Sequence, residues 1–172
     1  SSSSSWQVSL NSKVTGSKGY LRLHLPDQMY TTYPQYDTGI DANLLTFNGA
    51  TNSAGEGAYN NLVNNYIAYC WHSVPGYSAF GSYEGNLSLD GPFVNCGFKP
   101  AFVMVKNIDG AEVWSLWDNV RDGKRLIPNE SYGDQAEGEI AFYSNGFKLT
   151  SENSANNSGT CIYMAFAEKP PT

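Results

Sequence analysis

Short apolar runs separated by turn residues recur along the whole chain. In several of them apolar and polar positions alternate, as Leu21, Leu23 and Leu25 do with Arg22 and His24. A period of two is typical of a strand that buries one face. The pattern therefore predicts strands at 6–10, 20–25, 43–47, 66–71, 93–96, 101–106, 113–117, 139–144, 147–150 and 161–167.

The breaks between these runs have the chemistry of tight turns, because an Asn or Asp repeatedly precedes a Gly. No stretch has a sustained helical period, and residues 57–65 are long enough for one short helical turn at most. Short strands joined by such turns predict an all-β fold, an antiparallel β-sandwich or jelly roll, in a single domain over 1–172. The turn pairs are Asn48-Gly49, Asp90-Gly91, Asp109-Gly110, Asp122-Gly123 and Asn145-Gly146.

The two halves of the chain resemble each other weakly. Matches occur in the same order along both halves, although chance reuse of similar strands and turns is an alternative explanation. We interpret them as two half-repeats, at about 6–75 and 93–170, that pack together because neither buries its apolar face alone. The matched segments are 6–10 with 114–118, 22–27 with 125–129, 48–49 with 145–146, and 67–75 with 162–170.

The repeat predicts a strand that the first half lacks. Strand 101–106 precedes 113–117 and should pair with it as a hairpin, but no counterpart precedes strand 6–10. We therefore expect this chain to be the C-terminal piece of a longer protein. An open strand edge is rarely left bare. The edge at 6–10 should be covered by upstream residues, by another subunit or by a rearrangement of the chain.

Composition narrows the function classes. The 172 residues carry 10 Lys and Arg against 16 Asp and Glu, a net charge of −6, and 14% of them are aromatic. This length fits one domain, and the recurring aromatic residues argue against disorder. An acidic chain with scattered cations does not suit nucleic acid. No apolar run approaches the roughly 20 residues of a membrane span, so no membrane insertion is expected.

The cysteines predict free thiols. Cys70, Cys96 and Cys161 are widely spaced, and no Cys-x-x-Cys pair suggests a zinc site. Cys70 and Cys161 fall in predicted strands, where a thiol is usually a small buried apolar group. Unpaired thiols fit assembly in a reducing cytoplasm.

Catalytic chemistry has little support. His24 and His72 are the only histidines, and no Gly-x-Ser-x-Gly elbow accompanies them. Glycoside cleavage needs two close carboxyls with separated pKa values. The spacing of Asp118 and Asp122 lacks the alternation of a calcium-binding loop. We expect no catalytic residue, no cofactor and no metal site. The carboxylates available for a pair are Asp118, Asp122, Asp134, Glu137 and Glu139.

Two aromatic segments, at 30–36 and 77–83, are the strongest candidates for binding. The rings in each segment are spaced by three residues, and we predict both segments to be loops. A tyrosine set among Asn and Ser can stack on a sugar and hydrogen-bond its hydroxyls. Alternatively the rings cap the end of the core or pack on a neighbouring subunit. The candidate binding residues are Tyr30, Tyr33, Tyr36, Tyr77, Phe80 and Tyr83.

Several longer segments resemble a known family. The sequence resembles a repeated domain found towards the C-terminal end of tail-fibre and other virion proteins of aquatic bacteriophages. The likeness covers residues 62–170 well and 6–61 loosely. The segments that carry it are 66–86, 90–106, 117–122, 142–149 and 162–168.

The resemblance implies a virion appendage that is assembled in the host cytoplasm. It implies a homo-oligomer, with a trimer favoured, in contact with other virion proteins; it assigns no site residues. Exposed aromatics in a chain with few charges also favour association. The expected function is non-enzymatic binding of a host-surface glycan or other receptor. A glycan-degrading tail enzyme and a purely structural virion decoration are the alternatives.

Overall fold

The computed structural model describes residues 7–10, 19–31, 38–40, 45–47, 65–131, 133–134, 139–152 and 154–169. These residues contain strands and turns, and no helix long and apolar enough to cross a membrane occurs among them. The strands are β1 Gln7–Leu10, β2 Gly19–Arg22, β3 Thr38–Ile40, β4 Leu45–Phe47, β5 Ser78–Gly85, β6 Phe93–Asn95, β7 Pro100–Asn107, β8 Ser115–Asp118, β9 Ile140–Tyr143, β10 Gly146–Leu149 and β11 Gly159–Ala167.

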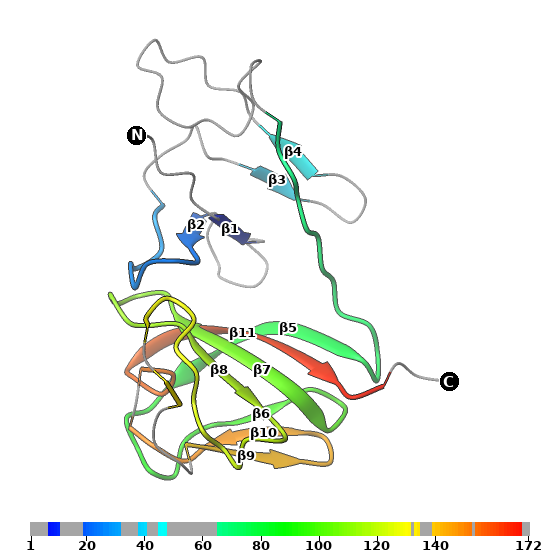
Figure 1. Cartoon of the computed structure of the whole chain (residues 1–172), viewed down its shortest axis with the longest axis vertical. Helices are drawn as coiled ribbons and strands as arrows, with labels where there is room; N and C mark the ends of the chain where they lie inside the picture. Colours follow the sequence, from blue (N-terminus) through cyan, green and yellow to red (C-terminus); the bar gives the residue numbers. More distant parts are fainter. Residues whose placement is uncertain are drawn as a thin grey trace.

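Two antiparallel sheets form a β-sandwich, which confirms the predicted fold class (Figure 1). The large sheet has the order β5-β11-β7-β8, and the small sheet has the order β6-β10-β9. The central strand β11 forms ladders with both β5 and β7. The predicted hairpin of β7 with β8 is confirmed, with Val103 opposite Trp117. Two further hairpins, β1–β2 and β3–β4, stand outside the sandwich sheets.

The main core lies between the two sheets. Alternate residues of β7 and β11 point into it, including Val103, Val105, Cys161 and Ala165. From the small sheet Phe147 enters fully buried. Its ring meets two tyrosines of the large sheet edge-on, which is the geometry that aromatic pairs prefer. These contacts make the sandwich core continuous from one sheet to the other.

The opposite face of the large sheet is also covered. Met104 and Ile162 point to that face and pack in a second cluster with Leu21 of β2 and with Trp114. The Trp114 indole donates a hydrogen bond of 3.1 Å to the carbonyl of Arg22. Figure 1 shows the β1–β2 hairpin on the side of the large sheet away from the small sheet. Burial on both faces explains why β7 and β11 read as nearly continuous apolar runs.

A buried lysine closes the turn that follows β7. The side chain of Lys106 is fully buried, and its ammonium donates to the carbonyls of Asn107 at 2.6 Å and Gly110 at 3.3 Å. Burial lowers the pKa of Lys106 to about 8, although the negative charges of Glu112 and Asp27 act to raise it. The lysine thus supplies the turn carbonyls with donors at the cost of burying a charge.

Two strand assignments differ from the sequence prediction. The strand predicted at 66–71 is wrong, because residues 65–73 form an extended, exposed segment outside the four sheets. We call residues 65–73 the arm. The loop predicted at 77–83 is also wrong, because all of it except Tyr77 lies within β5. A Cβ at Gly81 would lie 2.8 Å from the Tyr163 ring, so this glycine in β5 is required by packing.

The cysteines are free, as predicted, and Cys161 is buried in β11. Cys70 is exposed, which contradicts its predicted burial, because the arm that contains it is not part of a sheet. Strand β3 was not predicted at all. The predicted turn at 48–49 lies outside the described residues, as do all but the last residue of the predicted helical turn at 57–65.

The two predicted half-repeats have one strand pairing in common and differ in the position of their last strand. Val8 of β1 pairs with Leu21 of β2, and Leu116 of β8 forms a bridge with Leu126. By contrast, β11 is the central strand of the large sheet, while the arm, its counterpart in the repeat, lies outside the sheets. Within the described residues β1 has β2 as its single neighbour, whereas β8 also pairs with β7.

The core between the sheets should dominate stability. We expect Phe147→Ala to lower the free energy of unfolding by about 3–5 kcal/mol, because it removes a fully buried ring and leaves a cavity. The control is Phe93→Ala on the neighbouring strand, where the ring is exposed and the loss should stay below about 1 kcal/mol. Denaturant titration measures both, and equal losses would contradict the two-sheet core.

The buried lysine predicts a pH dependence. Between about pH 8 and the ordinary lysine pKa, the unfolded chain holds a proton that the folded chain has released, so unfolding becomes harder as pH rises. We expect the free energy of unfolding of the wild type to rise relative to Lys106→Met over this range, by at most about 3 kcal/mol. Comparison with the variant cancels the titration of other groups. A difference that stays constant with pH would contradict the burial of Lys106.

Candidate binding surface

Two of the predicted aromatic residues gather at one end of the large sheet. Tyr77 and Phe80 are half-buried and meet Phe166 of β11 edge-on, with ring centroids 6.0 and 5.7 Å away. Phe102 of β7 approaches the same ring at 6.0 Å. The cluster therefore joins three strands of the large sheet. This arrangement fits the alternative in which these rings pack at the end of the core.

The other predicted residues do not join this cluster. Tyr83 packs in the sandwich core, where its hydroxyl donates to the carbonyl of Ala155 at 2.5 Å and burial raises its pKa well above the usual range. Tyr30 stacks on Tyr20 at 5.1 Å, and its hydroxyl donates to Asp27 at 2.8 Å. Tyr33 and Tyr36 lie outside the described residues. The six candidates are thus not brought together at one site.

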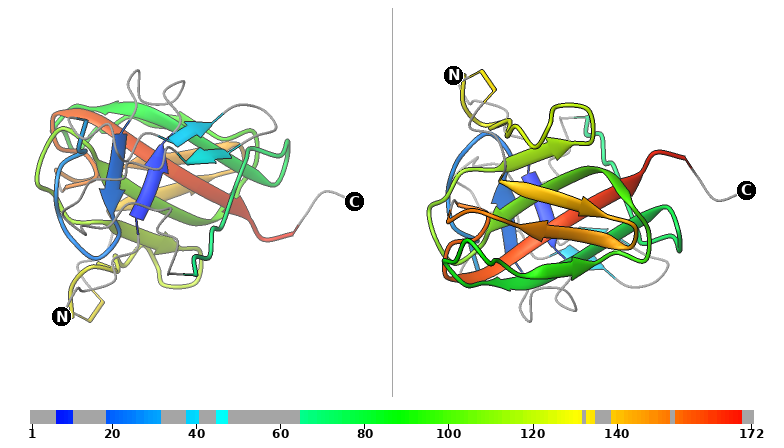
Figure 2. Two further views of the ribbon diagram at one scale, coloured as in Figure 1. Left: turned by 90° about the horizontal axis from the view of Figure 1, so that it is seen from above. Right: turned by 90° about the horizontal axis from the view of Figure 1, so that it is seen from below.

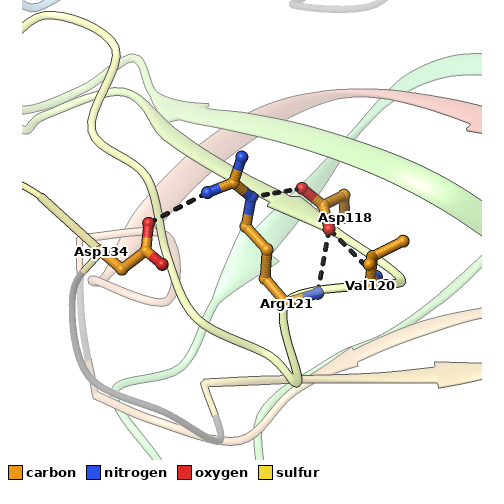
Figure 3. A network of polar contacts seen from close by, with 4 residues as sticks. All are labelled: Asp118, Val120, Arg121 and Asp134. Atoms are coloured by element: carbon orange, nitrogen blue, oxygen red, sulfur yellow. Dashed lines mark hydrogen bonds and ion pairs between the residues drawn. The ribbon is translucent and has the colours of Figure 1, made fainter.

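The carboxylates of the 118–134 region are held in a network of their own. Arg121 donates to Asp118 at 2.7 Å and to Asp134 at 3.0 Å (Figure 3). The other oxygen of Asp118 accepts from the backbone amides of Val120 and Arg121. Partial burial acts to raise the pKa of Asp118, but these hydrogen bonds lower it overall. A carboxyl with a lowered pKa is poorly suited to be the general acid of a glycosidase.

The remaining polar candidates are not assembled into a catalytic group. Glu139 pairs with Arg125 at 3.1 Å in a largely buried position, and Glu137 lies outside the described residues. His24 and His72 are both exposed. In the part of the chain that the structure describes, no three His, Cys, Asp or Glu side chains are grouped so that they could hold a metal ion.

The outer face of the small sheet carries an exposed aromatic pair. The exposed fraction is 46% for Phe93 of β6 and 45% for Tyr143 of β9. Their ring centroids are 5.7 Å apart in an edge-on arrangement. The strands alternate, so that Val94 and Phe147 point to the core while Phe93 and its partner Lys148 point outward. The outward pair therefore follows from the same alternation that builds the core.

Charged groups border the aromatic pair. Lys148 lies on β10, between the two strands that carry the rings, and forms an ion pair with the exposed carboxylate of Asp90. The hydrogen bond from Lys148 lowers the pKa of Asp90, and the same bond raises the pKa of Lys148. Both groups therefore stay charged at neutral pH. We call Phe93, Tyr143, Lys148 and Asp90 the small-sheet platform.

Close approach of β6 and β10 fixes the platform. A Cβ at Gly146 would lie 2.0 Å from the carbonyl oxygen of Val94, so only glycine allows the two backbones to approach this closely. Gly146 also lies opposite Tyr143 in the ladder between β10 and β9. This glycine thus sets the position of the strands on which the two rings stand.

The platform has the chemistry of a carbohydrate-binding surface. Exposed rings can cover the apolar face of a sugar, and the tyrosine hydroxyl, the ammonium and the carboxylate supply donors and acceptors for sugar hydroxyls. Sequence reasoning missed it because Phe93 and Tyr143 are 50 positions apart. The alternation of 93–95 around Val94 was the available signal, but the antiparallel order β6-β10-β9 was needed to join the two rings.

An open depression at the surface is a weaker candidate for a binding site than the small-sheet platform. It has a volume of about 310 Å³ and is lined by Lys99, Pro100, Ala101, Asn119, Glu168 and Lys169. It contains no aromatic ring, and its charges are mixed. Ligand sites usually combine apolar walls with a few convergent polar groups. The small-sheet platform is therefore the better candidate.

Comparison with known proteins gives a family but no function. No curated protein and no solved structure matches the chain. The family model described as a domain of unknown function, DUF7483, matches residues 1–170. The chain belongs to the DUF7483 family.

Proposed function

We propose that this chain is a non-enzymatic module of a bacteriophage virion appendage, such as a tail fibre, and that it binds a host-surface glycan through the small-sheet platform. The exposed pair of Phe93 and Tyr143 beside a charged Lys148–Asp90 pair carries the proposal. Neither ring is needed to fill the core, because the inward residues of the same strands do that.

The phage assignment rests on the sequence resemblance. A β-sandwich suits an appendage because a rigid two-layer scaffold can present one open sheet face to a partner. In this proposal the protein is assembled in the host cytoplasm and belongs to the virion. The homo-oligomer, with a trimer favoured, and contacts with other virion proteins are part of the same proposal. Exposed apolar residues such as Ile67, Leu89 and Val120 support association.

The enzymatic alternative predicts a product. If the domain degraded host glycans, incubation with host capsule would release reducing sugar. We expect no release, because Arg121 holds Asp118 and Asp134 and no observation favours a general acid among the described carboxylates. The purely decorative alternative predicts folded protein without glycan binding.

The platform should control glycan binding. We expect Phe93→Ala and Tyr143→Ala each to weaken binding to host glycan at least about 5-fold, because each removes a stacking ring worth about 1 kcal/mol or more. Tyr143→Phe should retain most of the stacking. The measurement is binding to a glycan array, followed by titration with the best ligand.

The matched control is Val120→Ala, which removes an exposed apolar side chain from the turn after β8, outside the small-sheet platform, and should leave affinity unchanged. Denaturant titration of each variant confirms that the fold is intact. Full binding by both Phe93→Ala and Tyr143→Ala would show that the platform is not the site. Absence of any binding by the folded wild type would favour virion decoration.

A further inference from the structure

The outer face of the small sheet carries a single positive charge among neutral groups. Lys148 is the one charged residue in the three strands β6, β9 and β10. Asn95, which is exposed, and Tyr143 lie opposite Gly146 in the ladders on its two sides. The right-hand view of Figure 2 looks onto this face, with β9 and β10 in front of the large sheet. The face therefore offers two rings, an amide, a phenol hydroxyl and one ammonium.

The most exposed charge on the small-sheet platform is nevertheless negative. The exposed fraction of the side chain is 85% for Asp90 and 30% for Lys148. The Asp90 carboxylate accepts a hydrogen bond from the Lys148 ammonium. This bond raises the pKa of Lys148, and an interaction with Tyr143 acts in the same direction. Because the carboxylate is the more exposed group, an approaching anion is repelled by Asp90 before it reaches the ammonium.

The backbone around Asp90 is fixed, so its carboxylate is not easily moved aside. The Asp90 amide donates to the Ser88 hydroxyl at 3.1 Å, and the Asp90 carbonyl accepts from the Asn86 side chain at 3.1 Å. The amide of the next residue, Gly91, donates to the carbonyl of Leu149 in β10 at 3.1 Å. A Cβ at Gly91 would lie 2.5 Å from that carbonyl oxygen, so only glycine permits this close approach. The loop is thus attached to β10 directly beside Asp90.

A buried asparagine holds the same loop from the inside. The side chain of Asn156 is fully buried, and its amide donates to the carbonyls of Ser88 at 2.7 Å and Ser151 at 2.9 Å. Its side-chain oxygen accepts from the backbone amide of Asn86 at 3.1 Å. A buried amide whose donors and acceptor are all used specifies one arrangement of the groups around it. The loop therefore presents Asp90 to the platform in a defined position.

We propose that the platform accepts a neutral glycan of hexoses or N-acetylated hexosamines, and that Asp90 excludes acidic polysaccharides. The inference rests on the proposed function and names the class of glycan that the same site takes. A uronate would have to displace Asp90 from Lys148 while the Asp90 carboxylate stayed close by, so two negative groups would share one ammonium. The net charge of −6 adds repulsion of the same sign. A neutral sugar leaves the ion pair intact and uses its outer donors and acceptors for hydroxyl groups.

Matched sugars test the exclusion of acids. A hexose and its uronate differ only in oxidation at C6, so an array that carries both members of each pair isolates the effect of charge. We expect the wild type to bind the hexose at least about 10-fold more tightly than the uronate. Asp90→Asn should reduce this ratio at least about 10-fold, because Lys148 can then pair with the uronate. Uronate binding by this variant should weaken as salt is added.

Two further variants separate a local effect from a change in net charge. Asp122→Asn removes one negative charge from the exposed turn after β8, outside the platform, and should leave the ratio unchanged. Asparagine tolerates the positive φ of 52° at this position. Asp90→Asn combined with Lys148→Gln removes both charges, and the uronate binding gained by Asp90→Asn should be lost. Denaturant titration of each variant confirms that it is folded.

The outcomes distinguish the inference from the function on which it rests. A preference for hexose that falls in Asp90→Asn but not in Asp122→Asn supports the inference. A wild type that binds uronate as tightly as hexose overturns the inference and leaves the proposed glycan binding standing. A ratio that is the same in Asp90→Asn and in the wild type also overturns it. A folded wild type that binds neither class contradicts the proposed function, and the inference with it.

Discussion

Burial of the large sheet on both faces is the constraint on which the rest of the structure depends. Its central strand β11 forms ladders on both edges, and its side chains enter one cluster toward the small sheet and another toward the β1–β2 hairpin. A sheet that is covered on both faces has few ways left to contact anything else. Recognition must then use the outer face of the small sheet, the loops or the edges. The small-sheet platform is one of these surfaces.

The same constraint separates packing aromatics from binding aromatics. Tyr83 packs against the core between the sheets, and Phe166 packs against Phe80 of the neighbouring strand. Both rings therefore stabilise the fold. Phe93 and Tyr143 stand on the small sheet, whose outer face carries no further described layer. The edge-on contact between them holds the pair in one arrangement, and this reduces the conformational entropy that a ligand would have to remove. Lys148 and Asp90 lie beside the two rings and form an ion pair with each other.

The sequence predicted the all-β class and most strands, because period-two alternation and Asn-Gly or Asp-Gly turns are local signals. It failed where pairing decides the structure. Residues 66–71 have the local features of a strand, yet a strand also needs a paired strand, and the arm belongs to none of the sheets that the described strands form. In β5, Gly81 is required by the Tyr163 ring, a contact that no local pattern reveals. The platform was missed for the same reason, since strand order brings Phe93 to Tyr143.

Chemical-shift mapping of the isotopically labelled domain during titration with fragments of a host-surface polysaccharide tests the central claim most directly. The account predicts saturable shifts centred on Phe93, Tyr143 and Lys148, with the arm and the turn at Val120 unaffected. Shifts centred on the arm, or on the cluster around Phe166, would contradict the assignment of the small sheet as the binding face.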